Sequence, residues 1–140
     1  MTREMILSGH RTVTVILGLI LLIHVLTIIS SLLQGNFGLP QLIRVGLTFW
    51  LAWSVYRGSA VARWIMVVLL VFAAITTFNG GMHLTELSAR VSETLQNPGA
   101  LKGVIFMAYG MATAYGLSAI ALAFMPNVKA YFAYVQGQAS

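Results

Sequence analysis

Charge and cysteine are scarce in this chain of 140 residues. Only 8% of the residues are charged, and the three acidic residues are all glutamates. Soluble domains carry about 25% charged residues, so this composition excludes a water-soluble globular fold. Because cysteine is absent, disulfides, thiol catalysis and metal sites built on thiolates are excluded as well.

The small number of carboxylates also limits the classes of function that the chain can have. Glu4, Glu86 and Glu93 all lie outside the long apolar runs, whereas ion-coupled carriers usually place a carboxylate inside the membrane. The sequence contains no glycine-rich phosphate loop, paired carboxylates or nucleophile triad. We therefore predict that the chain is not an enzyme and has neither catalytic residues nor a metal site.

What the chain does have is apolar sequence: 59% of its residues are hydrophobic and its mean hydropathy is +0.87. A spanning helix needs about 20 apolar residues. The runs predict an all-α integral membrane four-helix bundle, forming a single transmembrane domain over residues 1–140. The expected spans are about 12–33, 40–56, 64–82 and 101–125.

Two further helices are predicted outside these spans. Residues 83–97 place leucine and valine three or four positions apart among polar residues, which is typical of an amphipathic helix on the membrane surface. We expect this surface helix between spans 3 and 4. In residues 127–136 a similar spacing of apolar residues predicts a short interfacial helix.

The basic residues predict the orientation. They stand singly beside apolar runs, which is typical of membrane orientation signals and not of nucleic-acid contact. The side that holds both termini would carry Arg3, Arg11, Arg57, Arg63 and Lys129, and the other side Arg44, Arg90 and Lys102. Since cytoplasmic loops are richer in Lys and Arg, we expect both termini to be cytoplasmic.

The fourth span is rich in small residues, which allow helix backbones to approach closely. They form two rows at a spacing of four. The rows are Ala108, Ala112 and Gly116, and Gly110 with Ala114. Such rows pack either against helices of the same chain or against another subunit.

His24 falls near the middle of the first span, where an ionisable residue suggests a functional site. Its structural alternative is a neutral histidine bonded to nearby hydroxyl groups. We predict a ligand pocket between spans one and four, lined by His24, Thr27, Ser31, Tyr109 and Tyr115. His10 and His83 lie at other depths, which disfavours a haem with two histidine ligands from one chain.

Arg44 lies about one turn inside the second span. The acidic residues expected on its side of the membrane are Glu86 and Glu93. We predict that Arg44 pairs with one of them and holds the surface helix over the bundle. The alternative is that its side chain reaches a lipid phosphate.

Two short stretches carry a resemblance. The stretch from Tyr56 to Trp64 (YRGSAVARW) resembles the hinge between spans two and three of small four-span bacterial inner-membrane proteins, and that from Met125 to Phe132 (MPNVKAYF) resembles their ending. The chain departs from this pattern at Val61, where tryptophan is common, and at Lys129, where arginine is common. The resemblance implies a four-span architecture in a bacterial cytoplasmic membrane and no activity.

These observations favour a membrane protein that acts by helix association, as an accessory or stabilising subunit or by self-association, in contact with the lipid bilayer. The alternative is a module that binds or transports an apolar ligand or cofactor, such as a quinone, haem or pigment, through His24. A channel would need a polar stripe through several spans, and only the first span has one.

Overall fold

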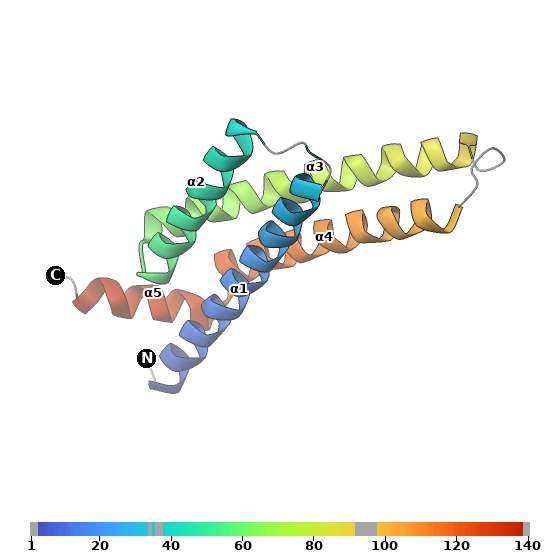
Figure 1. The fold of residues 1–140 in the computed structure, drawn as a ribbon. Helices are drawn as coiled ribbons and strands as arrows, with labels where there is room; N and C mark the ends of the chain where they lie inside the picture. The colour runs from blue at the N-terminus through green and yellow to red at the C-terminus, as the bar shows by residue number, and fades with distance from the viewer. Residues whose placement is uncertain (1–2, 34, 36–37, 92–97, 139–140) are drawn as a thin grey trace. The chain divides into compact units, whose positions relative to one another are not determined.

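The computed structural model describes residues 3–33, 35, 38–91 and 98–138. Within these ranges the chain forms helices and no strand (Figure 1), which confirms the all-α class. The helices are α1 (Arg3–Leu33), α2 (Leu39–Tyr56), α3 (Ala60–Val91), α4 (Pro98–Phe124) and α5 (Pro126–Gln138).

Three of the helices are long and apolar enough to cross a membrane. These stretches are Arg3–Ser30 in α1, Ala60–Arg90 in α3 and Gly99–Phe124 in α4. The predicted second span corresponds to a shorter apolar helix, Leu42–Tyr56. The structure therefore supports a membrane-embedded helical chain with three spans by length and composition.

Helix α3 corrects the predicted boundary after residue 82. It continues through Gly80 and Gly81 to Val91, so the first part of the predicted surface helix is a direct extension of the third span. Residues 92–97 of that prediction lie outside the described residues. A glycine inside a helix lowers the stability of that helix by only about 1 kcal/mol relative to alanine. Unless a proline also removes a backbone hydrogen bond, this cost is too small to end a helix of this length.

Several hydroxyl groups in these helices bond to their own backbone. They donate to the carbonyl oxygen four residues earlier, as Thr27 Oγ1 does to Ile23 at 2.8 Å and Thr113 Oγ1 to Tyr109 at 2.9 Å. Since lipid offers no hydrogen-bond partners, this local bond makes a hydroxyl tolerable within a span.

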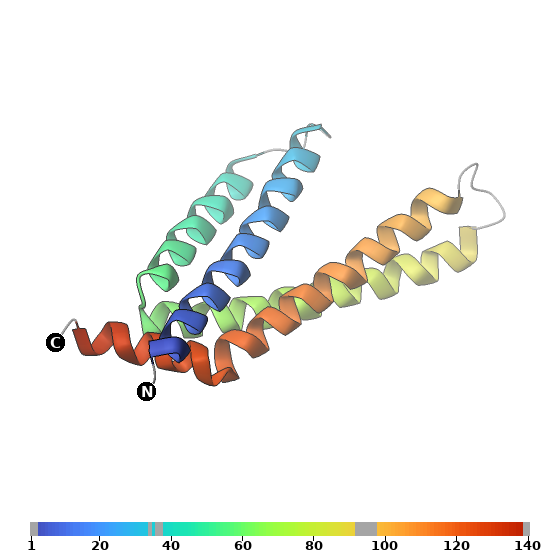
Figure 2. The same cartoon turned by 90° about the horizontal axis from the view of Figure 1, so that it is seen from below.

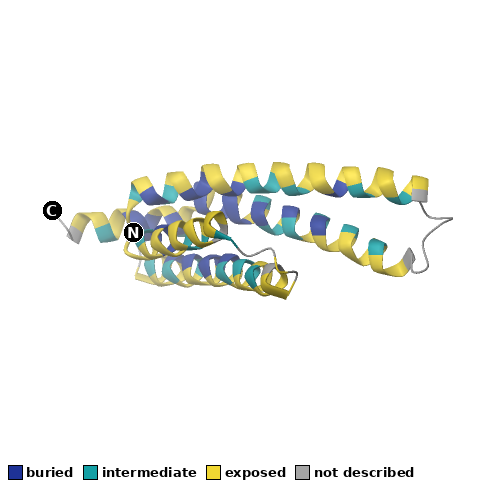
Figure 3. Ribbon diagram, turned by 45° about the horizontal axis from the view of Figure 1, so that its top comes forward, coloured by how far each residue is buried: buried dark blue, intermediate teal, exposed yellow. Residues whose placement is uncertain are grey.

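The chain divides into two compact units. The first contains Met1–Val67 and Ile120–Ser140, and the second Val68–Ala119. In the first unit α1 packs against both α2 and α5, and α2 runs alongside α1 (Figures 1 and 2). Its fully buried side chains are Val13, Ile20, Val55, Leu122 and Val128, and Figure 3 shows such buried positions alternating with exposed ones along each helix.

Helix α5 is held against α1 by a close backbone approach. A Cβ atom on Gly9 would overlap the carbonyl oxygen of Asn127 and would lie 2.9 Å from the Cβ of Tyr131. Val128, Tyr131 and Phe132 are accordingly buried. A helix is therefore present where the interfacial helix is predicted, over Pro126–Gln138, and its buried side chains pack within the protein.

We expect Gly9→Ala to destabilise the fold by about 1–3 kcal/mol, because the added methyl group overpacks the contact between α1 and α5. Thermal unfolding of the purified chain in mild detergent measures the effect. The matched control is Gly18→Ala, also on α1, where an added Cβ meets no atom within 4 Å. It should stabilise the chain by about 0.5–1 kcal/mol. If Gly9→Ala and Gly18→Ala changed the stability equally, the close approach of α5 to α1 at Gly9 would be contradicted.

Candidate functional site

The turn between α2 and α3 is short and almost fully hydrogen-bonded. Gly58 has a φ of +85°, and the Gly58 and Ser59 N–H groups donate to Val55 O (2.9 Å) and Ser54 O (3.1 Å). This is a Schellman helix end. Ser59 then caps α3, because its Oγ accepts from Ala62 N at 3.2 Å.

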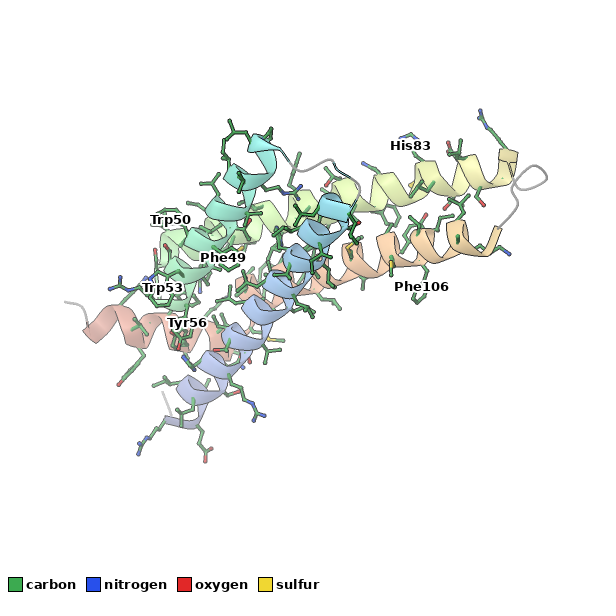
Figure 4. All side chains as sticks on the ribbon, viewed as in Figure 1. Phe49, Trp50, Trp53, Tyr56, His83 and Phe106 are labelled. Carbon is green, nitrogen blue, oxygen red and sulfur yellow. The ribbon has the colours of Figure 1, made fainter. Side chains whose placement is uncertain are left out.

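The carbonyl group of Tyr56, at the last position of α2, is satisfied from another helix. The Tyr131 hydroxyl of α5 donates to Tyr56 O at 2.7 Å. The half-buried His10 ring of α1 lies against both tyrosine rings, with centroids 5.5 Å from Tyr56 and 5.3 Å from Tyr131. Figure 4 shows Tyr56 at the end of α2 that lies next to α5. Three helices thus meet at this aromatic cluster.

Asn127 forms the polar part of the same junction. Its Nδ2 donates to Ser8 Oγ and Thr12 Oγ1 of α1, at 3.2 Å each. Its Oδ1 accepts from Val128 N at 3.0 Å. Pro126, which suits the first position of a helix, begins α5 directly before it. We call the group of His10, Tyr56, Asn127 and Tyr131 the junction cluster.

The junction cluster is suited to holding helices together. Burial raises the pKa of Tyr131 above its ordinary value of 10.0, and the neighbouring Tyr56 adds to the rise. The Tyr131 hydroxyl therefore stays protonated, and remains a donor, over the physiological pH range. Among the described residues, no group of three or more His, Cys, Asp or Glu is placed to hold a metal ion.

The residues predicted for the ligand pocket fall into both units. In the first unit, His24 Nδ1 lies 2.9 Å from Ile20 O, so its ring bonds to the backbone of its own helix and not to the hydroxyl groups considered above. Thr27 bonds to Ile23 O in the same way. Ser31 belongs to α1, and its side chain lies outside the described part.

The tyrosines of the predicted pocket belong to the second unit. Tyr115 is buried, and Tyr109 packs edge-on against Phe78 of α3, with centroids 5.4 Å apart. Tyr109 also lies 3.3 Å from the position of a Cβ on Gly81. Because His24 and the tyrosines lie in different units, a pocket shared by all of them stays a prediction.

An open groove of about 320 Å³ lies between α3 and α4 in this second unit. It is lined by Ala74, Ile75, Phe78, Ala112 and Thr113. His83 of α3 and Phe106 of α4 point outward on opposite sides of the helix pair (Figure 4). The groove is therefore apolar apart from one hydroxyl, and no histidine lines it.

The small residues of α4 differ in exposure. In the first predicted row Ala108 and Ala112 are buried and Gly116 is half-buried. In the second row Gly110 is exposed, and Ala114 is half-buried. A Cβ on Gly110 would meet no atom within 4 Å, so the backbone is open at this position.

The residues of the predicted ion pair belong to different units. Arg44 is exposed on α2 in the first unit, and Glu86 is exposed on α3 in the second. Glu93 lies outside the described residues. The pairing of Arg44 with either glutamate stays a prediction.

Sequence reasoning missed the junction cluster. Its members are far apart in the chain, and the bond from Tyr131 to Tyr56 joins residues separated by 75 positions. A usable signal was nevertheless present, since Tyr56, Asn127 and Tyr131 all belong to the two stretches singled out above. Asparagine directly after a proline that begins a helix was the second clue.

The fold defines a helical membrane protein with three candidate spans in its described part. Comparisons of the chain with protein-family models, with curated proteins and with solved structures find no match. Proposals about its function therefore rest on its own residues and geometry.

We expect Tyr131→Phe to lower the free energy of unfolding by about 1 kcal/mol, because it leaves the Tyr56 carbonyl without its donor. Thermal unfolding in detergent at pH 7 measures this loss. The control is Gln136→Ala at an exposed position of α5, which should stay within about 0.5 kcal/mol of the wild type.

The pH dependence has a defined sign. Because folding raises the pKa of Tyr131 above 10.0, its contribution is fully present below pH 10 and is lost as the pH rises through the folded-state pKa. The stability difference between wild type and Tyr131→Phe should therefore be constant from pH 7 to 9 and shrink above pH 10. A stability difference that grows with pH would contradict the hydrogen bond from the Tyr131 hydroxyl to the Tyr56 carbonyl.

Proposed function

We propose that the chain is an integral protein of the bacterial cytoplasmic membrane, with α2 as a fourth span beside α1, α3 and α4. Helix α2 has 18 residues, which is within the range of about 17–25 residues for a span. An even number of spans puts both termini on one side. Arg57 and Arg63, near the turn between α2 and α3, favour the cytoplasm for that side.

Within that membrane, the proposed function is helix association, either as an accessory or stabilising subunit of a membrane complex or by self-association. The observation that carries this proposal is the uncovered row at Gly110 on α4. Helix pairs in lipid associate through close packing at small residues, and Gly110 has open space where a partner backbone would approach.

The neighbours of Gly110 suit a helical partner. Met107 and Leu117, which are 67% and 62% exposed, lie on the same face of α4 as Gly110 and Ala114. Large side chains above and below a small one form the hole that receives a side chain from another helix. The partner would therefore be an apolar transmembrane helix of another subunit or of a second copy of this chain.

The test is association measured by energy transfer between labelled chains in lipid vesicles. We expect Gly110→Leu to weaken association about tenfold or more, equivalent to about 1.4 kcal/mol. The control is Gly18→Leu on α1, where the surroundings are equally open. A wild-type chain that stays monomeric, with no co-purifying protein from native membranes, would contradict the proposal.

The groove between α3 and α4 favours a second candidate function, which is binding of an apolar ligand or cofactor. Its volume of about 320 Å³ is at the lower end of the range for ligand pockets, about 300–1,000 Å³. An optical spectrum of the purified protein tests for a haem or pigment, and mass spectrometry of its lipid extract tests for a quinone. A colourless protein without a bound small molecule would exclude this function.

A further inference from the structure

Exposed polar side chains form a stripe along the second half of α3. Its members are alternately three and four positions apart, so they lie on one side of the helix. We call this set the polar stripe, and it consists of Thr76, Asn79, His83, Glu86 and Arg90, all exposed. Tyr109 of α4 contacts a different side of α3, at Thr85 and near Gly81. Figure 4 shows His83 pointing away from α4.

The position of Asn79 along α3 places it inside the membrane. Trp64, near the start of the candidate span Ala60–Arg90, is a residue typical of the membrane interface. At about 1.5 Å per residue, Asn79 lies about 22 Å beyond it, whereas the hydrocarbon core is about 30 Å thick. Ile75 and Met82, one turn before and after Asn79, are 54% and 46% exposed. The Asn79 amide therefore lies within an apolar surface.

This amide has no partner within the described ranges. Thr76 Oγ1 donates to Phe72 O at 3.0 Å and Thr85 Oγ1 to Gly81 O at 2.8 Å, but no hydrogen bond of these ranges involves the Asn79 side chain. An amide carries two N–H donors and one carbonyl acceptor, and lipid tails can bond to neither. Asparagine side chains in membranes form hydrogen bonds between helices, so a second helix is the partner that suits Asn79.

The backbone beside the polar stripe is open to such a helix. A Cβ on Gly80 would meet no atom within 4 Å, whereas a Cβ on Gly81 would lie 3.3 Å from the ring of Tyr109. Phe72, which is 65% exposed, continues the spacing of the polar stripe by one further position. A small residue next to a polar one allows two backbones to come close enough for their side chains to bond.

A second copy of α3 is the helix that fits this surface. Positions alternately three and four apart keep one face toward an identical helix in a left-handed pair. A single asparagine at such a position sets the register by pairing with its counterpart. Glu86 and Arg90 carry opposite charges and form no ion pair with described residues. Between two copies in register, each faces the opposite charge one layer along.

We propose that two copies of this chain pair in parallel through the polar stripe of α3. Each Asn79 amide donates from Nδ2 to the Oδ1 of its counterpart across the two-fold axis, which is the commonest symmetry of oligomers. The inference rests on the proposed function of helix association. It names the partner as a second copy, and it places the contact on α3, whereas the open backbone at Gly110 is on α4.

Cross-linking of single cysteines in native membranes tests the pair, since the chain has no cysteine of its own. His83→Cys, on the polar stripe, should form a disulfide-linked dimer on mild oxidation. The matched control is Ala89→Cys, equally exposed on α3 and about 100° around the helix from Arg90. It should remain monomeric. A monomeric His83→Cys, or equal cross-linking of Ala89→Cys, would overturn the proposal.

A third cysteine separates this proposal from the one on α4. A cross-link at Gly110→Cys without one at His83→Cys would overturn the pairing of α3 and leave the proposed function standing. A cross-link at His83→Cys without one at Gly110→Cys would support the pairing of α3 and count against the contact on α4. If neither variant cross-links and energy transfer finds only monomers, both proposals fail.

Substitutions then test the chemistry of the contact, with association measured by energy transfer in lipid vesicles. We expect Asn79→Leu to weaken association about tenfold and Asn79→Gln to retain most of it. The control Thr76→Val should have little effect, because that hydroxyl bonds to its own backbone.

A charge exchange tests the second copy and its register. Glu86→Arg should weaken association about threefold, and the added change Arg90→Glu should restore it. Association of Asn79→Leu at the wild-type level, or no recovery in the double variant, would overturn the proposal.

Discussion

The close approach of α5 to α1 at Gly9 is the contact on which the first unit of this protein depends. Without a side chain at Gly9, the backbone of Asn127 comes against α1. The same approach brings the Asn127 amide to the hydroxyls of Ser8 and Thr12. It also carries Tyr131 to the last carbonyl of α2. One missing methyl group therefore allows three helices to be joined by hydrogen bonds.

The lipid environment explains why so few polar groups are left for function. A buried polar group in the membrane must find its partner within the protein, and here hydroxyls, the His24 ring and the turn after α2 all bond to nearby backbone. The open backbone surface at Gly110, where an added Cβ would meet no atom within 4 Å, is the place where the proposed partner helix would pack.

Much of the secondary structure could be predicted, because long apolar runs in a chain with so little charge are expected to form helices. The helix predicted over 40–56 is present as α2, Leu39–Tyr56, within one residue. The predicted helix boundary at Gly80 and Gly81 was wrong, because the low helix propensity of glycine is a small cost compared with the stability of a long helix. The junction cluster escaped prediction because contacts between Ser8 and Asn127, or between Tyr56 and Tyr131, leave no periodic pattern in the sequence.

The absence of cysteine allows a direct measurement of the central contact. Ser8→Cys and Asn127→Cys, introduced together, place two thiols at positions whose side chains lie 3.2 Å apart, from Nδ2 to Oγ. Mild oxidation in native membranes should form a disulfide within one chain, whereas Ser8→Cys paired with a cysteine at exposed Gln136 should not. The account predicts a cross-linked monomer on a denaturing gel. Failure of the first pair to cross-link, or cross-linking only between chains, would contradict the packing of α5 on α1.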